Sequence, residues 1–570
     1  MTNKTSSDWA THAEQTDFRE TPSYADTIDF CRRLAEASTV IEFQSFGKSG
    51  QGRDLPLLIA SETQAFTPTV AKAGKKAIVL IQACIHSGEP DGKDAGFALL
   101  RDLAITKTVA GILENVVLLF IPIYNTDGHE RSSQYNRINQ NGPVSMGWRT
   151  TRTYQNLNRD YVKADTPETR AWHALWNKWQ PDLFIDCHVS DGADYRSNIT
   201  FHYERHAGID PEIIEWERNV FSNRVAQATA DAGNTISWYL EFIDNRDLPL
   251  GMRDFNGPPR FSTGYVPLRN RPAILIETHM LKDYRSRVKG TYDFLHAALT
   301  EVNKDPQQLI DLGQRADLRA HTNQTYPLNF KLTDSATPFD LKAFNYTTEQ
   351  SEISGDLRVI YGDKPLDLTV PMYETLATTV SVEPPVSYVV PVEWNEVIEV
   401  LESHGLSMQK LSSNTSIPVE SYRFLDVEWP STPFEGRHMP RFSVTKTDEV
   451  REFAAGSVVV PFAQPLARLV MNLLEPQAPD SFVHWGFFNA IFEEKEYGEP
   501  YVLEQLARDM IAANPELQIE FVKALTEDPQ LARNPYERLK YFYKRSPYWD
   551  PQMDLYPVGR IRSALDLPGI

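Results

Sequence analysis

Three apolar runs in the first half of the chain have the length and β-branched content of buried strands, and each leads into a polar group. The runs are AIVLIQA at 77–83, LFIDC at 183–187 and AILI at 273–276. Short runs of this kind are typical of strands that are covered on both faces. In an open α/β sheet, the crevice outside the carboxyl ends of the strands is where distant segments meet. We therefore expect the polar groups to lie just past the strand ends and to converge there.

The groups that follow these runs have the chemistry of a catalytic zinc site. His86 and Glu89 follow the first run, His188 the second, and Glu277 the third. A catalytic zinc commonly takes three protein ligands from His and Glu or Asp and leaves one position for water. His86, Glu89 and His188 supply three ligands, which leaves Glu277 free to take a proton from that water. Arg149 carries a guanidinium suited to stabilising an oxyanion.

The backbone around Glu89 supports this arrangement. Pro90 disfavours the helical basin for the residue before it and can open a helix at its first position, so we expect a loop at 86–89 and a helix over 91–104. Taken singly, however, each motif has an ordinary explanation. In a chain with 13 His and 77 acidic residues, His-x-x-Glu arises by chance on the order of once. The prediction depends on the whole set.

Four segments together carry a resemblance to a known family. They are HSGEPDG at 86–92, WRTTRTYQNLNRD at 148–160, DCHVSDG at 186–192 and ILIETHM at 274–280. In order, spacing and flanking residues they resemble the zinc carboxypeptidase family, the carboxypeptidase A-like metallopeptidases, over about residues 21–299.

The resemblance implies a role for each matching residue. It makes His86, Glu89 and His188 the ligands of one zinc ion and Glu277 the general base. Arg149 matches the arginine that polarises the scissile carbonyl. The Asn-Arg pair, Asn158 and Arg159, matches the clamp on the terminal carboxylate of the substrate, and an arginine can hold a carboxylate through two parallel hydrogen bonds.

Two departures from the family pattern concern residues around these groups. Asn156 stands where the family usually has an Asp that contacts a zinc-bound histidine, and Asp186, on the same strand face as His188, is another candidate for such a contact. Phe255 stands where an ungapped alignment places the substrate-binding tyrosine of the family. Tyr265 is the nearest replacement, although a half-buried structural aromatic is an equally good explanation for it.

Composition excludes several other classes of protein. The formal net charge of −20 and the lack of a basic tract with interleaved aromatics exclude a nucleic-acid footprint. No apolar run approaches 18 residues, so we expect no membrane span. The three cysteines, at 31, 84 and 187, are too few for a disulfide scaffold and fit buried core positions. The start of the chain as given lacks a secretory signal, which leaves a periplasmic or secreted location if a leader was removed and a cytoplasmic one otherwise. The oligomeric state is not readable.

The length of 570 residues predicts two or three domains. We predict an α/β catalytic domain with a mixed central sheet flanked by helices over 1–305. A β-rich accessory domain follows over 306–462, where β-branched runs alternate with prolines. A mainly helical region, packed on the rest, covers 463–570.

The sequence thus predicts a zinc-dependent metallocarboxypeptidase that hydrolyses the C-terminal peptide bond of a peptide with a free C-terminus. Two alternatives remain open. One is a zinc amidohydrolase acting on N-acyl amino acids or peptidoglycan stem peptides, which the same clamp would serve. The other is a catalytically silent protein that binds a peptide or glycan.

Overall fold

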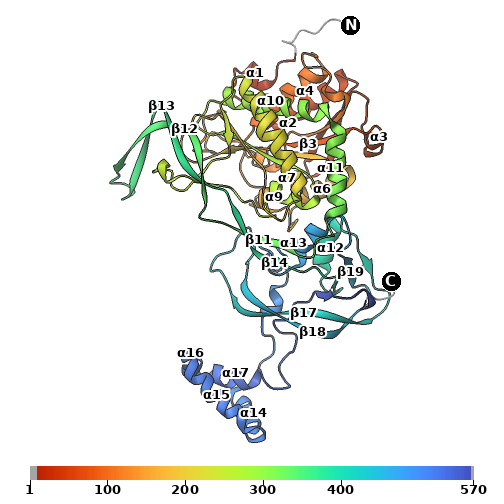
Figure 1. Ribbon diagram of the computed structural model, residues 1–570, viewed down its shortest axis with the longest axis vertical. Coiled ribbons are helices and arrows are strands. Elements are labelled where there is room, and N and C mark those ends of the chain that lie inside the picture. Colours follow the sequence, from red (N-terminus) through yellow and green to blue (C-terminus); the bar gives the residue numbers. More distant parts are fainter. Residues whose placement is uncertain (1–8, 567–570) are drawn as a thin grey trace.

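The computed structural model describes residues 9–566 (Figure 1). Residues 1–8 and 567–570, at the outer ends of the first and third predicted ranges, lie outside the described part. The first half of the chain is built around an eight-stranded sheet in the order β1-β2-β4-β3-β5-β10-β6-β7. Its strands are β1 (Ile41–Lys48), β2 (Asp54–Ala60), β3 (Ala77–Gln82), β4 (Val116–Ile121), β5 (Leu183–Ser190), β6 (Ile199–His202), β7 (Ile236–Trp238) and β10 (Ala273–His279).

The sheet is mixed, as predicted. Its centre, β4-β3-β5-β10, is parallel. The edge strands β1 and β2, and the pairing of β10 with β6, are antiparallel. Parallel strands need helical crossovers, which cover both faces of the sheet. The three predicted strand runs are β3, β5 and β10, and β3 and β5 are buried along their whole length.

Residues that alternate along β3 serve two different cores. Ile78 and Leu80 face the core that contains α6 (Pro167–Trp179). Val79 and Ile81 face the core that contains α4 (Asp91–Ala104) and α10 (Tyr284–Lys304). The two-residue period of a strand therefore explains the three-layer arrangement.

Helices form where caps and apolar stripes predict them. Thr166 caps α6 by accepting from the Thr169 amide, and Pro167 occupies its first turn. Trp172, Trp176 and Trp179 of α6 recur at helical spacing and are buried. The other helices are α1 (His12–Gln15), α2 (Tyr24–Ala37), α3 (Pro68–Ala73), α5 (Thr126–His129), α7 (Pro211–Glu217), α8 (Ala226–Asp231), α9 (Ser262–Tyr265), α11 (Pro306–Arg319), α12 (Asn395–Ser403), α13 (Ala467–Leu474), α14 (Pro500–Ala513), α15 (Pro515–Glu527), α16 (Pro529–Arg533) and α17 (Pro535–Tyr543). Among residues 9–566, no helix has both the length and the apolar character that crossing a bilayer requires.

The second half of the chain is rich in strands, as predicted. A six-stranded sheet has the order β16-β19-β15-β20-β17-β18, and β11 pairs with β14. Strands β12 and β13 form a long hairpin that projects from the molecule (Figure 1). The bounds are β11 (Tyr326–Leu332), β12 (Ala336–Gln350), β13 (Leu357–Tyr373), β14 (Leu376–Val382), β15 (Ser387–Val390), β16 (Gln409–Lys410), β17 (Thr415–Glu428), β18 (Arg441–Phe453), β19 (Val458–Pro461) and β20 (Gly559–Ile561).

Strand pairing links the three predicted ranges. The hairpin β12-β13 shares a sheet with β9 (Met252–Arg253) and β8 (Glu241–Phe242) of the first range, and β20 of the third range lies between β15 and β17 of the second. The division at 305 and 462 stays a prediction. The prediction that the helical region 463–570 packs on the rest is wrong for helices α14 to α17, which project from it (Figure 1). Their apolar faces form a small separate core, which includes Ala507, Leu517 and Phe542.

Candidate active site

His86 and Glu89 lie in the loop that joins β3 to α4. This loop is a tight turn in which the Glu89 amide donates to the His86 carbonyl at 2.9 Å. Pro90 occupies the N-cap position and α4 begins at Asp91, so Pro90 precedes the helix instead of opening it. The turn places the His86 and Glu89 side chains side by side, and their exposed fractions are only 3% and 2%.

His188 and Glu277 do not lie past the strand ends, as the sequence predicts, but inside the strands. His188 belongs to β5 and Glu277 to β10, two residues before the end of each. The two residues are direct neighbours in the parallel register of these strands. The apolar runs stop at Cys187 and Ile276, but the backbone ladder continues through the polar residues. Pairing with a neighbouring strand, rather than apolar content, sets where a strand ends.

Three side chains converge as a metal site requires. The ligand atoms of His86, Glu89 and His188 lie within 4.8 Å of one another, and this is the only such cluster of His, Cys, Asp and Glu among the described residues. His86 Nδ1 is 3.2 Å from Glu89 Oε1, and His188 Nδ1 is 3.1 Å from Glu89 Oε2. Cys31, Cys84 and Cys187 are buried free thiols outside this cluster.

The outer nitrogens of both histidines have partners. His86 Nε2 donates to Asn156 Oδ1 at 3.0 Å, and His188 Nε2 lies 3.1 Å from Asp186 Oδ2. An imidazole that donates through Nε2 keeps its Nδ1 lone pair for a metal. Both predicted outer contacts, from Asn156 and from Asp186, are therefore present, and the donor set fits a zinc ion.

Burial and neighbouring charges shift the pKa values of the three residues in the cluster. Burial lowers the pKa of His86 to about 4, so its imidazole is neutral at pH 7. Burial would raise the pKa of Glu89, but His86, Arg137 and the hydrogen bond from His188 outweigh it and hold that pKa well below its ordinary value. Burial would likewise lower the pKa of His188, but the charge of Asp186 outweighs it and raises that pKa well above the usual range. A cation between these groups would favour the neutral His188 form.

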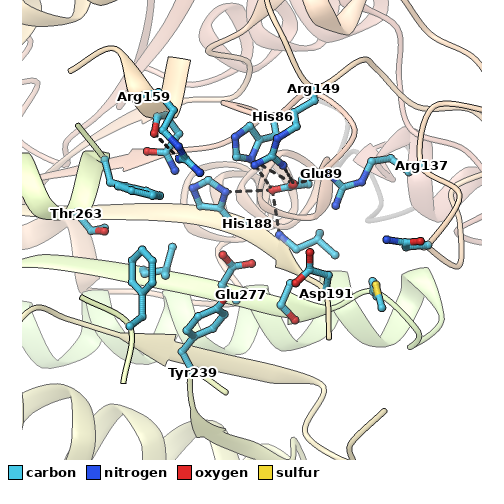
Figure 2. A pocket seen from close by; sticks show the side chains of 18 of the residues that line it. His86, Glu89, Arg137, Arg149, Arg159, His188, Asp191, Tyr239, Thr263 and Glu277 are labelled. Carbon is cyan, nitrogen blue, oxygen red and sulfur yellow. Dashed lines mark hydrogen bonds and ion pairs between the residues drawn. The ribbon is translucent and has the colours of Figure 1, made fainter. Parts of the chain in front are cut away.

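Glu277 lies opposite the cluster, on the same face of the sheet. Figure 2 shows it below His188, with its carboxyl group directed into the pocket. Burial, together with the charges of Glu89 and Asp191, raises the pKa of Glu277 to about 8, although His188 opposes the shift. Its Oε2 atom is buried and has no hydrogen-bond partner. A carboxylate in this state can accept a proton near neutral pH.

Three arginines border the same cavity, which has a volume of about 480 Å³. Arg149 Nη1 lies 3.5 Å from Glu89 Oε1, and Arg137 Nη1 donates to the same oxygen at 2.8 Å. Arg159 lies on the opposite side (Figure 2), with its guanidinium 3.8 Å from the centre of the Phe261 ring. Burial and the charge of Arg149 lower the pKa of Arg159 to about 10, so it remains a cation at pH 7.

Asn158 is fixed beside Arg159. Its amide nitrogen donates to Asn156 Oδ1 at 3.0 Å, and its own side-chain oxygen accepts from the Ser262 amide at 2.9 Å. Asn158 is one of the residues that line the cavity. The structure thus places Asn158 and Arg159 side by side on one wall.

Tyr265 is not brought to the cavity. Its side chain is fully buried, and its hydroxyl group contacts His404 Nδ1 at 2.7 Å and accepts from Arg269 Nη1 at 2.9 Å. A phenol held between two buried partners cannot reach a substrate, so the candidate role for Tyr265 is wrong. Tyr239 and Phe255 line the cavity instead.

Sequence reasoning missed Arg137, Asp191 and Tyr239. Arg137 lies in an irregular segment with no periodic pattern, and its side chain fills the space over Gly88, where an added Cβ would lie 2.8 Å from Arg137 Cγ. Nothing local to the sequence indicates this contact. Asp191 lies three residues after His188 in the segment DCHVSDG, and its acidic side chain was the one sequence signal for a place beside the site.

Comparison with known proteins agrees with this geometry. Residues 27–237 match the family model described as zinc carboxypeptidase. "Carboxypeptidase 2" of Trichophyton rubrum is 24% identical over 489 residues, which cover 82% of this chain and 84% of that protein. "Carboxypeptidase 2" of Trichophyton equinum is 23% identical over 484 residues, with the same shares of the two chains.

Among solved structures, a metallo-carboxypeptidase from Burkholderia cenocepacia is 17% identical, with a TM-score of 0.38, and covers 50% of this chain and 70% of that one. A metallo-carboxypeptidase from Pseudomonas aeruginosa, in complex with (2-guanidinoethylmercapto)succinic acid, is 18% identical, with a TM-score of 0.38, and covers 51% of this chain and 70% of that one. The family match and the cluster of His86, Glu89 and His188 lie in the same half of the chain. Residues 27–237 therefore resemble a zinc carboxypeptidase domain, and the three converging side chains lie within them.

Proposed function

We propose that the cavity binds one zinc ion through His86, Glu89 and His188 and removes the C-terminal residue of a peptide. The observation that carries this proposal is the position of Glu277. It is a carboxyl group without a hydrogen-bond partner at Oε2, beside three converging ligands and in the same cavity as an arginine clamp. Zinc bound there supplies a Lewis acid that makes a water molecule acidic enough to act as a nucleophile near neutral pH.

Glu277 would act as the general base. It would take a proton from the attacking water molecule and pass it to the leaving nitrogen. Arg149 would stabilise the negative charge that develops on the scissile carbonyl oxygen, because its guanidinium reaches the cluster from the open side of the cavity and 43% of its side chain is exposed.

Asn158 and Arg159 would hold the free carboxylate of the substrate. The Arg159 guanidinium lies over the Phe261 ring and donates to the Asn158 carbonyl, and it has no ion-pair partner among its described contacts. A cation that is partly removed from water and unpaired with an acid has a strong preference for an incoming anion. This clamp favours cleavage at a chain end over cleavage within a chain.

Substitution Glu277→Gln tests the proposed chemistry. Gln keeps the shape of the side chain but does not accept the proton, so we expect zinc content equal to that of the wild type and a fall in kcat of roughly 100- to 10,000-fold. Zinc content by mass spectrometry and hydrolysis of a peptide library provide the measurements. A matched control is Glu62→Gln, at an exposed acid in the same half. Activity of Glu277→Gln within a few fold of the wild type would refute the mechanism.

Substrate comparison separates the proposed peptidase from the alternatives. N-acyl amino acids, peptides with D-residues and ordinary peptides should be offered in parallel, each with a free and with an amidated C-terminus. We expect ordinary peptides with a free C-terminus to be hydrolysed fastest. Faster turnover of N-acyl amino acids would favour the amidohydrolase, and binding without any turnover would favour the silent binding protein.

A further inference from the structure

A turn in the second half of the chain reaches Asn156, two residues before Asn158 in the wall of the cavity. The connection between β17 and β18 contains residues 434–437, here named the tip. Phe434 and Arg437 pair through two backbone hydrogen bonds of 2.9 and 3.0 Å, and the two residues between them have positive φ angles, 49° at Glu435 and 78° at Gly436. This is the backbone of a two-residue hairpin turn, which presents the Glu435 side chain at its end.

The charge of Glu435 acts on Arg159, and its side chain makes one described hydrogen bond to the catalytic half. Its Oε2 atom accepts from the backbone amide of Asn156 at 2.9 Å, across 279 positions of sequence. Asn156 connects two parts of the site. Its side-chain oxygen accepts from His86 Nε2 and from the backbone amide of Asn158. Glu435 therefore fixes the residue that orients both a proposed zinc ligand and the proposed carboxylate clamp.

The tip is anchored firmly enough for this role. Arg437 Nε donates to Asp165 Oδ2 at 3.0 Å, and Arg437 Nη2 donates to Asp165 Oδ1 at 2.5 Å, which gives a two-pronged ion pair. Phe434 stacks on Trp485, with their ring centres 6.0 Å apart. A bidentate arginine–carboxylate pair that is mostly removed from water holds its geometry better than an exposed pair.

A second contact joins the second half of the chain to the segment next to the clamp. Arg260 Nη2 is 2.8 Å from Asp480 Oδ1, and the Arg260 amide donates to Asp480 Oδ2 at 2.7 Å. Asp480 is buried, with an exposed fraction of 1%. Phe261, the next residue after Arg260, supports the Arg159 guanidinium. Glu435 therefore holds the backbone just before the clamp, and Asp480 holds the backbone next to the Phe261 ring that contacts it.

We propose that Glu435 is a positioning residue of the active site, so that the β-rich half completes the carboxylate clamp of the catalytic half. The role named for the clamp rests on the proposed function. The contact itself predicts that loss of the Glu435 acceptor loosens the segment 156–159. Carboxylate binding then weakens at Arg159, and zinc binding weakens through the loss of orientation at His86.

Substitution Glu435→Asn is the first test. Asn suits a left-handed backbone, and it withdraws the acceptor by one methylene group, so the Asn156 amide loses its partner without strain in the tip. We expect KM for a peptide with a free C-terminus to rise about tenfold with kcat changed less than threefold. Glu435→Gln keeps an acceptor at the same reach, and we expect its KM to stay within threefold of the wild-type value. Glu428→Gln is the matched control, at an exposed acid of β17 whose side chain has no described hydrogen bond or ion pair.

Binding measurements keep the test independent of turnover. In the metal-free protein, calorimetry with a free amino acid as a product-like carboxylate should show affinity about tenfold weaker in Glu435→Asn. Calorimetry with Zn²⁺ alone should show weaker metal binding in the same variant. Thermal unfolding confirms that each variant is folded, and Glu435→Ala provides a second variant should Glu435→Asn be unstable.

The outcomes separate this proposal from the proposed function. Unchanged KM, carboxylate affinity and Zn²⁺ affinity in folded Glu435→Asn would overturn the positioning role. A protein that hydrolyses no peptide, but loses carboxylate and Zn²⁺ affinity on Glu435→Asn, would overturn the proposed function and support the positioning role.

Discussion

The metal cluster and the carboxylate clamp lie in one cavity but are supported in different ways. The cluster is held mainly by the central sheet of the first half, and the second half reaches it through the described contact of Glu435 with Asn156. His188 and Glu277 belong to neighbouring strands of the central sheet, and His86 and Glu89 belong to the turn after β3. The clamp, by contrast, lies on a loop, with Asn158 and Arg159 in a short helical turn at 157–159.

The difference shows how a rigid sheet and a loop are used for different tasks. A metal site must keep its groups at fixed distances, and backbone pairing fixes His188 on β5 relative to Glu277 on β10. A loop positions side chains less exactly, and here acids from the second half of the chain, Glu435 and Asp480, hold its backbone and that of the neighbouring segment. We therefore propose that the first half supplies the chemistry and that acids of the second half support substrate binding.

Substitution Arg159→Gln should produce the largest separation between the two parts. It removes the cation of the clamp and leaves the zinc ligands untouched, so we expect KM to rise roughly 10- to 100-fold for peptides with a free C-terminus. Zinc content should not change. Steady-state kinetics and metal analysis provide the two measurements.

A substrate with an amidated C-terminus is the matched control for Arg159→Gln. It lacks the anion that the clamp would bind, so the wild type and the variant should handle it equally. Should Arg159→Gln lose zinc instead, the metal cluster and the clamp would not be separately supported, and the comparison would fail.

Outer contacts of the two histidines offer a sharper test within the metal cluster. Asp186 contacts His188 with a charged oxygen, whereas Asn156 contacts His86 with a neutral one. Partners of this kind typically contribute 10- to 100-fold in metal affinity. We expect Asp186→Asn to weaken Zn²⁺ binding by roughly tenfold or more, and Asn156→Asp to strengthen it. Competition with a chelator measures both affinities, and a change in the same direction in the two variants would contradict this account.

How much of this could be predicted differs between the same two parts. The mixed sheet and the convergence of His86, Glu89, His188 and Glu277 were predictable, because apolar runs mark β3, β5 and β10 and the topology then brings their ends together. The prediction for Tyr265 failed because no local sequence pattern distinguishes a phenol buried against His404 from one that faces a cavity. The contact of Glu435 with Asn156 spans 279 positions, and no periodicity connects segments that far apart. Side-chain contacts between halves of a chain depend on tertiary packing, which single-sequence patterns do not contain.

Acid should weaken the boundary between the two halves. His206 stacks on Phe330 of β11 with ring centres 4.1 Å apart, and burial together with the charge of Arg468 lowers the pKa of His206 to about 3. A histidine whose folded pKa is depressed contributes stability above its unfolded pKa, and loses it as pH falls through the folded value. The free energy of unfolding should therefore decrease as pH falls from about 6.5 towards 3, with a slope of about 1.4 kcal/mol per pH unit from this group.

Substitution His206→Asn tests this dependence by urea unfolding of the metal-free protein at several pH values. Asn can accept from the Gly208 amide, as His206 Nδ1 does at 3.1 Å, but it does not titrate. We expect a shallower decrease in the free energy of unfolding between pH 6.5 and 4 than in the wild type. His438→Asn, at an exposed histidine, should leave the decrease unchanged. An identical slope in His206→Asn and the wild type would exclude His206 as its source.

The smallest effect is expected from the outer part of the β12-β13 hairpin, which contrasts with the tip. Tyr346 and Tyr361 still contact the first half, through the Leu248 amide and the Asn245 carbonyl, and residues 347 and 360 pair just beyond them. Further out, the described ion pair with the first half joins Arg246 to Asp356, and because water screens both charges it contributes little to stability. Replacement of residues 348–359 by Asn-Gly should therefore leave kcat and KM within about twofold of the wild type. A tenfold rise in KM would mean that this hairpin, like the tip, takes part in substrate binding. Glu435 and Asp480 would then not be the specific source of support from the second half.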